Sequence, residues 1–140
     1  VQLNIRKNLL GSLVSGSVRS ANAHVANMLL AFYLATGQDA ANIVEGSQAI
    51  TFGEVKGEDL YFTVTLPNLI LGTIGNGKNL DFVKDNLELM GFDVNASDEL
   101  DAKKLAGLCA ATVLCGELSL LAAQTNQGEL MDAHKRIERS

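Results

Sequence analysis

The stretch Leu105–Ala123 (LAGLCAATVLCGELSLLAA) constrains the fold more than any other part of this sequence. It is long and apolar enough to be considered as a membrane-spanning helix. Glu117 lies inside it, however, and a carboxylate is costly in lipid, while Lys103 and Lys104 flank it at one end only. Its many Ala, Gly, Ser and Cys residues allow other segments to approach closely. We therefore expect the buried central helix of a folded domain, and no membrane span from this segment.

The rest of the chain predicts further helices and a small antiparallel sheet. Asn22–Thr36 is rich in helix formers and is followed by Gly37, a typical helix end. Ala49–Val55 and Leu60–Leu71 carry β-branched and aromatic residues and predict a hairpin, in which Pro67 confines its strand to an edge. The fold class is thus expected to be α+β, with a buried central helix, packing helices and a small antiparallel sheet in one domain over residues 1–140. The remaining expectations are a strand end at Val1–Ile5, short helices at Lys7–Ser17 and from Asp39 to Val44, and helices at Leu80–Met90, Asp101–Gln124 and about Gly128–Glu138.

Composition and charge limit the kinds of partner. With 140 residues, 47% of them hydrophobic, the chain can bury a core. A net charge of −5 and a pI near 4.9 argue against a nucleic-acid partner, which would need a basic face. Cys109 and Cys115 would point to different faces of one helix, so we expect free thiols in a reducing, cytoplasmic compartment. The chain opens at Val1 without a methionine or a leader, and from this we expect a fragment of a longer polypeptide.

The glycine-rich segment Gly72–Lys78 (GTIGNGK) has the G-x-x-x-x-G-K spacing of a phosphate-binding loop. Asn79 follows it, where that motif needs a Ser or Thr hydroxyl for magnesium, and Pro67 disfavours a central parallel strand before it. A nucleotide triphosphatase site is therefore disfavoured. The simpler interpretation is a glycine turn whose backbone N–H groups approach a phosphate or an amide of a ligand.

Local sequence alone predicts only structural or surface roles for the residues that could take part in chemistry. His24 and His134 are the only histidines, and neither has partners at metal-ligand spacing, so no metal site is predicted. His24 suits a hydrogen-bonded packing residue, and His134, within the polar segment MDAHKRIER, suits a solvated surface residue. Asp39 suits the N-cap of a helix, and Lys7 a solvent-exposed cation.

The order of several motifs along the chain is more specific than any single residue. NIRKNLLGS is followed by NAHVANMLLAFYLATGQDAAN, by EDLYFTVTLPNLILGTIGNGK, by AGLCAATVLCGELSLLAA and by GELMDAHKRIERS. This order resembles the C-terminal part of the large domain of hydroxymethylglutaryl-CoA reductases, over nearly the whole chain. The segments NAH-x-AN, ATGQDAAN and GELSL are the most specific. The glycine loop and the C-terminal segment match more loosely, with departures at Asn76, Lys78, Asp132 and Lys135.

The resemblance assigns roles by position. It implies that Asp39 is a catalytic aspartate that works with a lysine and a glutamate, and that His134 protonates the departing CoA thiolate. It also implies that Lys7 and Asn27 contact the hydroxymethylglutaryl group. The positions implied to lie near the nicotinamide cofactor are Gly75, Asn76, Glu138 and Arg139.

The implied activity is the reduction of 3-hydroxy-3-methylglutaryl-CoA to mevalonate and CoA with two NADPH, with NADH as an alternative reductant. Family members build their active sites at subunit interfaces, so we expect a homo-oligomer, a dimer or larger. The family's catalytic lysine and glutamate, its D-x-M-G-x-N motif and its small NADPH-binding domain are absent from this sequence. The chain alone is therefore expected to be inactive. The alternative is a non-catalytic helical binding or assembly domain on the same scaffold.

Overall fold

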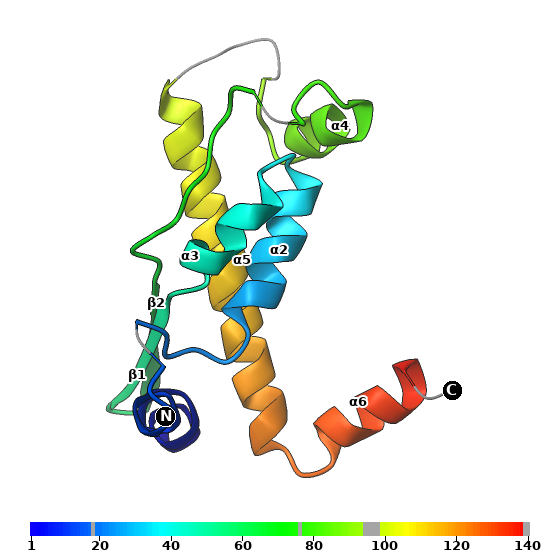
Figure 1. The fold of residues 1–140 in the computed structure, drawn as a ribbon. Helices are drawn as coiled ribbons and strands as arrows, with labels where there is room; N and C mark the ends of the chain where they lie inside the picture. The colour runs from blue at the N-terminus through cyan, green and yellow to red at the C-terminus, as the bar shows by residue number, and fades with distance from the viewer. Residues whose placement is uncertain (18, 76, 94–98, 139–140) are drawn as a thin grey trace.

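The computed structural model describes residues 1–17, 19–75, 77–93 and 99–138, and Figure 1 shows their arrangement. Helices α2 (Val25–Ala35) and α5 (Glu99–Thr125) pack against each other at the centre. An antiparallel sheet of β1 (Ile50–Lys56) and β2 (Asp59–Thr65) lies beside α5. The expected α+β class is confirmed. The other elements are the π-helix η1 (Asn4–Leu10), the helices α1 (Gly11–Val14), α3 (Ile43–Gly46), α4 (Asp81–Leu89) and α6 (Glu129–Ile137), and the 3-10 turn η2 (Ala40–Asn42).

Helix α5 is the expected core helix, and this chain covers it along one face. Ala111, Cys115 and Leu118 on its other side are exposed. The segment Ala102–Thr125 is long and apolar enough to span a membrane. In its most apolar 18-residue stretch, 33% is buried inside the fold. A fully buried carboxylate within the packed face favours a core helix. The buried side chains recur every fourth residue and form one stripe, which consists of Leu105, Cys109, Val113, Glu117 and Leu121.

The close approach of α2 to α5 depends on Gly116. A Cβ at this position would lie 2.4 Å from Cγ of Met28 on α2, so any larger residue would displace that side chain. Tyr33 of α2 is fully buried in the same core, and its hydroxyl donates to the carbonyl of Ile70 at 2.8 Å. Both cysteines of the chain are free thiols. Burial in this core raises the pKa of the Cys109 thiol to about 11.

The predicted hairpin is confirmed, with a second strand shorter than expected. Strands β1 and β2 pair antiparallel across a turn at Gly57, which has a φ of +67°. The expected strand ran on to Leu71, but β2 ends at Thr65. Pro67 has no N–H to donate to a neighbouring strand, so the chain leaves the ladder just before it.

The strand expected at Val1–Ile5 is wrong, because the N-terminal segment is helical. A short alternation of apolar residues does not separate a strand from a helix. Hydrogen bonds of Asn4 on η1 favour the helical conformation of this segment. The Nδ2 of Asn4 donates to the carbonyl of Thr51 at 3.2 Å. Its Oδ1 accepts from the Thr51 hydroxyl at 2.9 Å and from Asn8 Nδ2 at 2.7 Å. This buried network fixes the N-terminal helix against β1.

Glycines with a left-handed backbone mark the end of α4 and the start of α6. Gly91, with a φ of +81°, follows α4 as expected. Gly128, with a φ of +89°, precedes α6 and lets the chain turn away from α5. Helix α6 leaves the end of α5 and stands clear of the main body (Figure 1).

Candidate active site

Asp39 lies just beyond the C-terminal end of α2. The helix ends at Ala35, and Gly37 follows it with a φ of +64°, which glycine adopts without strain. Two residues later, Oδ1 of Asp39 accepts a hydrogen bond from the backbone N–H of Ala41 at 2.9 Å and caps η2. The predicted N-cap is thus confirmed. The Asp39 side chain is exposed, so its carboxylate is open to a ligand or to another charged group.

The side chain of Gln38 fastens the glycine loop to the segment that carries Asp39. Its Nε2 donates to the carbonyls of Thr36 at 3.1 Å and Gly72 at 3.0 Å. Its Oε1 accepts from the N–H of Gly72 at 2.9 Å. The same two segments meet again where Gly77 N–H donates to the Gly37 carbonyl at 3.2 Å. Sequence reasoning missed Gln38, because its burial is not visible in the sequence; its place directly after Gly37 was the signal that could have drawn attention to it.

The glycine loop itself is open on one side. Gly75 is exposed and has a φ of +78°. Lys78 Nζ donates to the carbonyls of Ile74 at 3.3 Å and Gly75 at 3.4 Å, and burial lowers the pKa of this ammonium. Lys78 therefore bonds to its own loop, and the helix that follows begins with Asp81, which disfavours a phosphate there. Asn76 lies outside the described residues.

Glu117 joins the two motifs NAH and GELSL. Its carboxylate is fully buried, and it accepts from the backbone N–H groups of Ala23 at 2.7 Å and His24 at 2.6 Å. These groups lie at the N-terminus of α2, where the helix dipole favours negative charge. Sequence reasoning noted Glu117 only as unfavourable in lipid. The buried carboxylate is what holds the start of α2 on α5.

His24 has the structural role that local sequence predicted. Its Nε2 lies 2.7 Å from the carbonyl oxygen of Gly116. A carbonyl oxygen only accepts, so Nε2 carries the proton in this contact. Together with the Glu117 contact, this bond fixes both the backbone and the ring of His24 against α5.

The two residues implied to bind substrate are both exposed. Lys7 lies on η1, and its ammonium donates to Oδ1 of Asn8 at 3.1 Å. Asn27 lies in the first turn of α2, directly after the NAH segment that Glu117 holds. Neither side chain is buried in the core, so both are available to a ligand.

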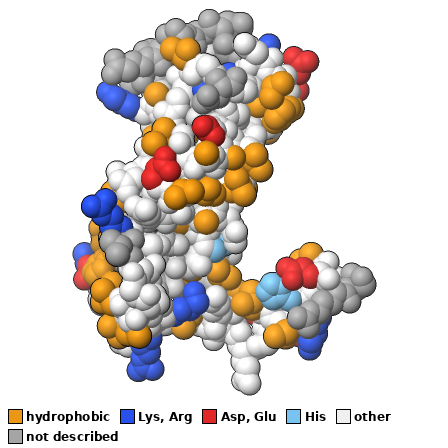
Figure 2. All heavy atoms as spheres, in the orientation of Figure 1, with side chains coloured by type: hydrophobic (Ala, Val, Ile, Leu, Met, Phe, Trp, Pro, Cys, Tyr) orange, Lys and Arg blue, Asp and Glu red, His pale blue; other side chains and the backbone are white. Residues whose placement is uncertain are grey.

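His134 lies on α6 and faces a groove between α5 and α6. Its Nδ1 is 2.9 Å from Oε2 of Glu138, one helical turn away. Figure 2 shows α6 apart from the main body, with histidine and acidic side chains together at its surface. Arg139 lies outside the described residues. The groove has a volume of about 450 Å³ and is lined by Ala123, Gln124, Asn126, Gln127, Gly128, Leu130, Met131 and His134.

The structure brings Asp39 and the glycine loop together but keeps the other predicted residues apart. Asp39 follows the end of α2 against which α4 packs, whereas His134 lies on α6, beyond the opposite end of the α2–α5 pair (Figure 1). Lys7 lies on η1 beside β1. Within the described ranges, no hydrogen bond or ion pair joins any two of Asp39, His134 and Lys7.

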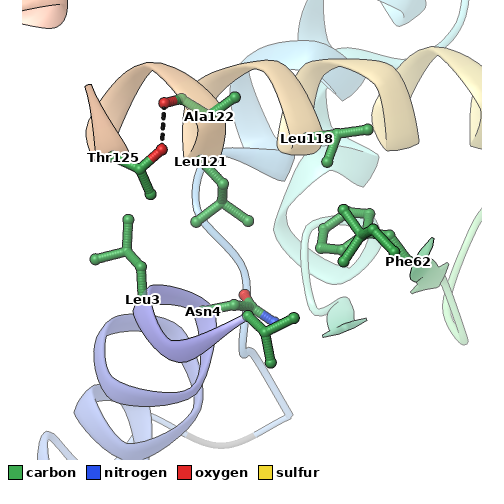
Figure 3. Close-up of a pocket in the computed structure, with 9 residues that line it drawn as sticks. Leu3, Asn4, Phe62, Leu118, Leu121, Ala122 and Thr125 are labelled. Atoms are coloured by element: carbon green, nitrogen blue, oxygen red, sulfur yellow. Dashed lines mark hydrogen bonds between the residues drawn. The ribbon is translucent and has the colours of Figure 1, made fainter. Parts of the chain in front are cut away.

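An apolar cavity of about 230 Å³ lies away from these residues. It is enclosed by the N-terminal helix, β2 and the C-terminal part of α5, and Figure 3 shows Leu3, Phe62 and Leu121 pointing into it. Thr125 at its rim donates its hydroxyl to the carbonyl of Ala122 at 2.7 Å. No predicted site residue lines this cavity. Its lining has no charged side chain, so it offers packing surface and no acid or base.

Comparison with known proteins gives a consistent result. The family model described as hydroxymethylglutaryl-coenzyme A reductase matches residues 1–139. The 3-hydroxy-3-methylglutaryl-coenzyme A reductase of Aeropyrum pernix is 47% identical over 138 residues, which cover 98% of this chain and 32% of that protein. The reductase of Methanocaldococcus jannaschii is 45% identical over 138 residues, covering 99% and 33%. Reductase 1 of Dictyostelium discoideum is 42% identical over 144 residues, covering 100% and 26%. The chain spans about a third or less of the length of these curated relatives.

Proposed function

This chain belongs to the hydroxymethylglutaryl-coenzyme A reductase family, and on that premise we propose that it forms the C-terminal part of the large domain of an enzyme that reduces 3-hydroxy-3-methylglutaryl-CoA to mevalonate and CoA. The observation that carries the proposal is the pair of hydrogen bonds between the Gln38 side chain and the backbone of Gly72, which we call the Gln38 clamp. It holds the glycine loop to the segment that carries Asp39. Since the chain spans about a third of the length of its relatives, the remaining catalytic groups come from sequence outside it. The separation of Asp39, Lys7 and His134 supports sites formed between subunits of a homo-oligomer.

Asp39 suits the role of a catalytic carboxylate. Hydride addition to a thioester carbonyl builds negative charge on its oxygen, and cations or hydrogen-bond donors must stabilise that charge. A carboxylate on a fixed backbone can hold a lysine ammonium at this oxygen and keep it charged. The hydrogen bond from the Ala41 N–H holds Oδ1 of Asp39, and the Gln38 clamp holds the backbone directly before it. The exposed carboxylate remains open to such a partner.

The glycine loop suits a flat cofactor with polar edges. Among the described atoms, none lies within 4 Å of the position that a Cβ on Gly75 would occupy, apart from those of the adjacent residues. A ligand can therefore approach the backbone closely. A bound NADPH, or NADH in its place, supplies the hydride. The residues that would hold it are Gly75 here and, by the resemblance alone, Asn76, Glu138 and Arg139.

His134 suits the acid that protonates the CoA thiolate. The first reduction gives a hemithioacetal, whose collapse breaks the C–S bond and leaves the electron pair on sulfur. A thiol with a reference pKa of about 8.5 needs only a modest acid. An imidazolium meets this need near neutral pH. His134 lines an open groove, which gives a pantetheine chain access to the ring.

Lys7 and Asn27 suit the hydroxymethylglutaryl group. This group carries a carboxylate and a tertiary hydroxyl, which an ammonium and a carboxamide can recognise. Lys7 is exposed, and its described acceptor, Oδ1 of Asn8, is a neutral oxygen that a substrate carboxylate could replace. Asn27 is exposed on the rigid first turn of α2.

The test uses the complete gene product that contains this chain, assayed with the thioester and with free mevaldehyde. Asp39→Asn is expected to abolish both reductions, since asparagine retains the helix cap but not the charge. His134→Gln is expected to lower thioester reduction by about 100-fold or more. It should lower mevaldehyde reduction far less, because no thiolate departs from an aldehyde.

Equal loss of both reductions in His134→Gln would contradict the acid role. A complete, folded gene product that binds CoA but reduces neither substrate would favour the alternative, a non-catalytic binding or assembly domain.

A further inference from the structure

The contact between His134 and Glu138 assigns the proton on one ring nitrogen. Oε2 of Glu138 lies 2.9 Å from Nδ1 of His134. A carboxylate only accepts hydrogen bonds, so Nδ1 carries a hydrogen in this contact whether the ring is charged or neutral. The nitrogen that can give up a proton is therefore Nε2. Among the described residues, Glu138 is the polar partner of this imidazole.

The exposure of the pair indicates what the contact does. The side chains of His134 and Glu138 are 44% and 62% exposed. An ion pair as exposed as this contributes little to folding stability. Its effect is on the ring: it selects a tautomer and restricts rotation. His134 also lines the groove between α5 and α6, so the ring is oriented at a surface that a ligand can reach.

We propose that Glu138 is a positioning residue that holds His134 with Nδ1–H on its carboxylate and so leaves Nε2–H as the proton given to the CoA thiolate. This proposal rests on the proposed function. As the hemithioacetal oxyanion left by hydride addition collapses, an electron pair of its oxygen forms the aldehyde carbonyl and the C–S bond breaks with its electron pair on sulfur. The proton moves from Nε2 to sulfur to form the thiol. The ring is left neutral, and its remaining hydrogen stays on Nδ1, which donates a hydrogen bond to the Glu138 carboxylate. Water returns the proton to Nε2 before the next turnover.

The arrangement follows a general pattern of histidine chemistry. A carboxylate that accepts from one ring nitrogen fixes the tautomer and stabilises the charged ring, while the other nitrogen exchanges the proton with substrate. The i and i+4 spacing on α6 places the two side chains on one face of a helix. Helix α6 thus carries the acid, and its C-cap residue Glu138 orients that acid.

The first experiment measures the ratio of thioester to mevaldehyde reduction in the complete gene product. Glu138→Ala is expected to lower this ratio roughly tenfold, a part of the effect of a general acid. Glu138→Gln is expected to recover most of the ratio, because its amide oxygen still accepts from Nδ1–H. The matched control is Asp132→Asn, which removes an exposed acid from the same helix and should leave the ratio unchanged.

The second experiment reads the tautomer of neutral His134 from the ¹⁵N chemical shifts of its ring. The native protein should show mainly the Nδ1–H form, and Glu138→Ala should raise the Nε2–H form. A merely structural role for Glu138 would not move this signal.

Distinct outcomes separate the two proposals. If His134→Gln cripples thioester reduction but Glu138→Ala changes neither the ratio nor the tautomer, the positioning role is overturned and the proposed function stands. An equal fall of both reductions in Glu138→Ala would leave Glu138 with only the cofactor contact that the resemblance implies, which overturns the positioning role. If His134→Gln leaves thioester reduction intact, both proposals for this helix fail.

Discussion

The segment around Asp39 is held by contacts inside the chain, whereas the helix that carries His134 is held mainly by its connection to α5. Three hydrogen bonds fix the Gln38 side chain between α2 and the glycine loop. On α6, every described residue is at least partly exposed, and the imidazole of His134 bonds to Glu138, the C-cap residue of the same helix. Both segments carry a proposed catalytic residue, yet they differ in what positions it.

This difference has a physical consequence for the two proposed catalytic residues. A side chain that is fixed by buried hydrogen bonds keeps its geometry when the site is empty. A side chain on a helix with few buried contacts takes its final position from a further surface, and such segments are suited to closing over a ligand. Substitutions at the residues that hold the Asp39 segment in place should therefore change stability and activity together, while those on α6 should change activity alone.

The largest expected effect is at Glu117, which anchors the start of α2. Glu117→Ala leaves two backbone N–H groups, of Ala23 and His24, without an acceptor in the core. We expect the free energy of unfolding to fall by about 3 to 5 kcal/mol, measured by urea denaturation. Glu88→Gln, at an exposed position on α4, should change it by less than about 0.5 kcal/mol. A loss below about 1 kcal/mol in Glu117→Ala would show that the contact is not an anchor.

A smaller loss is expected at the Gln38 clamp. Gln38→Ala removes the partners of the Gly72 N–H and carbonyl, and should lower the free energy of unfolding by about 2 to 3 kcal/mol. Reductase activity of the complete gene product should fall in parallel, because the glycine loop is released from Asp39. Gln2→Ala, at an exposed position, serves as the control. Full reductase activity in Gln38→Ala, together with the expected loss of stability, would contradict the proposed link between the glycine loop and Asp39.

At Asp39 the structural and catalytic roles can be separated. Asp39→Ala removes the cap from the N–H of Ala41 and should cost about 1 kcal/mol. Asp39→Asn keeps a capping oxygen, and its free energy of unfolding should stay within about 0.5 kcal/mol of the native value. Both variants should lose reductase activity. Retained activity in Asp39→Asn would leave the residue as a cap and nothing more.

The smallest stability effect is expected on α6. His134→Gln replaces a half-exposed side chain by a good helix former, so the free energy of unfolding should change by less than about 0.5 kcal/mol. The same variant should lose most thioester reduction, which would sharpen the contrast with Gln38→Ala. A change above 1 kcal/mol would mean that α6 is anchored more firmly than its exposure indicates.

Much of the secondary structure could be predicted from local patterns. The ends of α2 and α4 follow from Gly37 and Gly91, because a left-handed backbone stops a helix where a residue without a Cβ is available. The hairpin and the cap at Asp39 were predicted for similar reasons, since their determinants lie within a few residues of each other. The segment Val1–Ile5 was predicted wrongly, because its conformation depends on the hydrogen bonds between Asn4 and Thr51, 47 positions away.

The sequence by itself determined where α2 and α4 end and where the hairpin turns, and the order of its motifs indicated the family. Only the tertiary structure decided that Gln38 joins the glycine loop to Asp39 and that Glu117 holds the start of α2. These contacts connect positions 34 and 93 residues apart. Periodicity and turn propensity act over a few residues, so they do not specify which buried amide or carboxylate meets which distant N–H group. Packing of α2 on α5 brings those groups together, and burial then requires that each finds its partner.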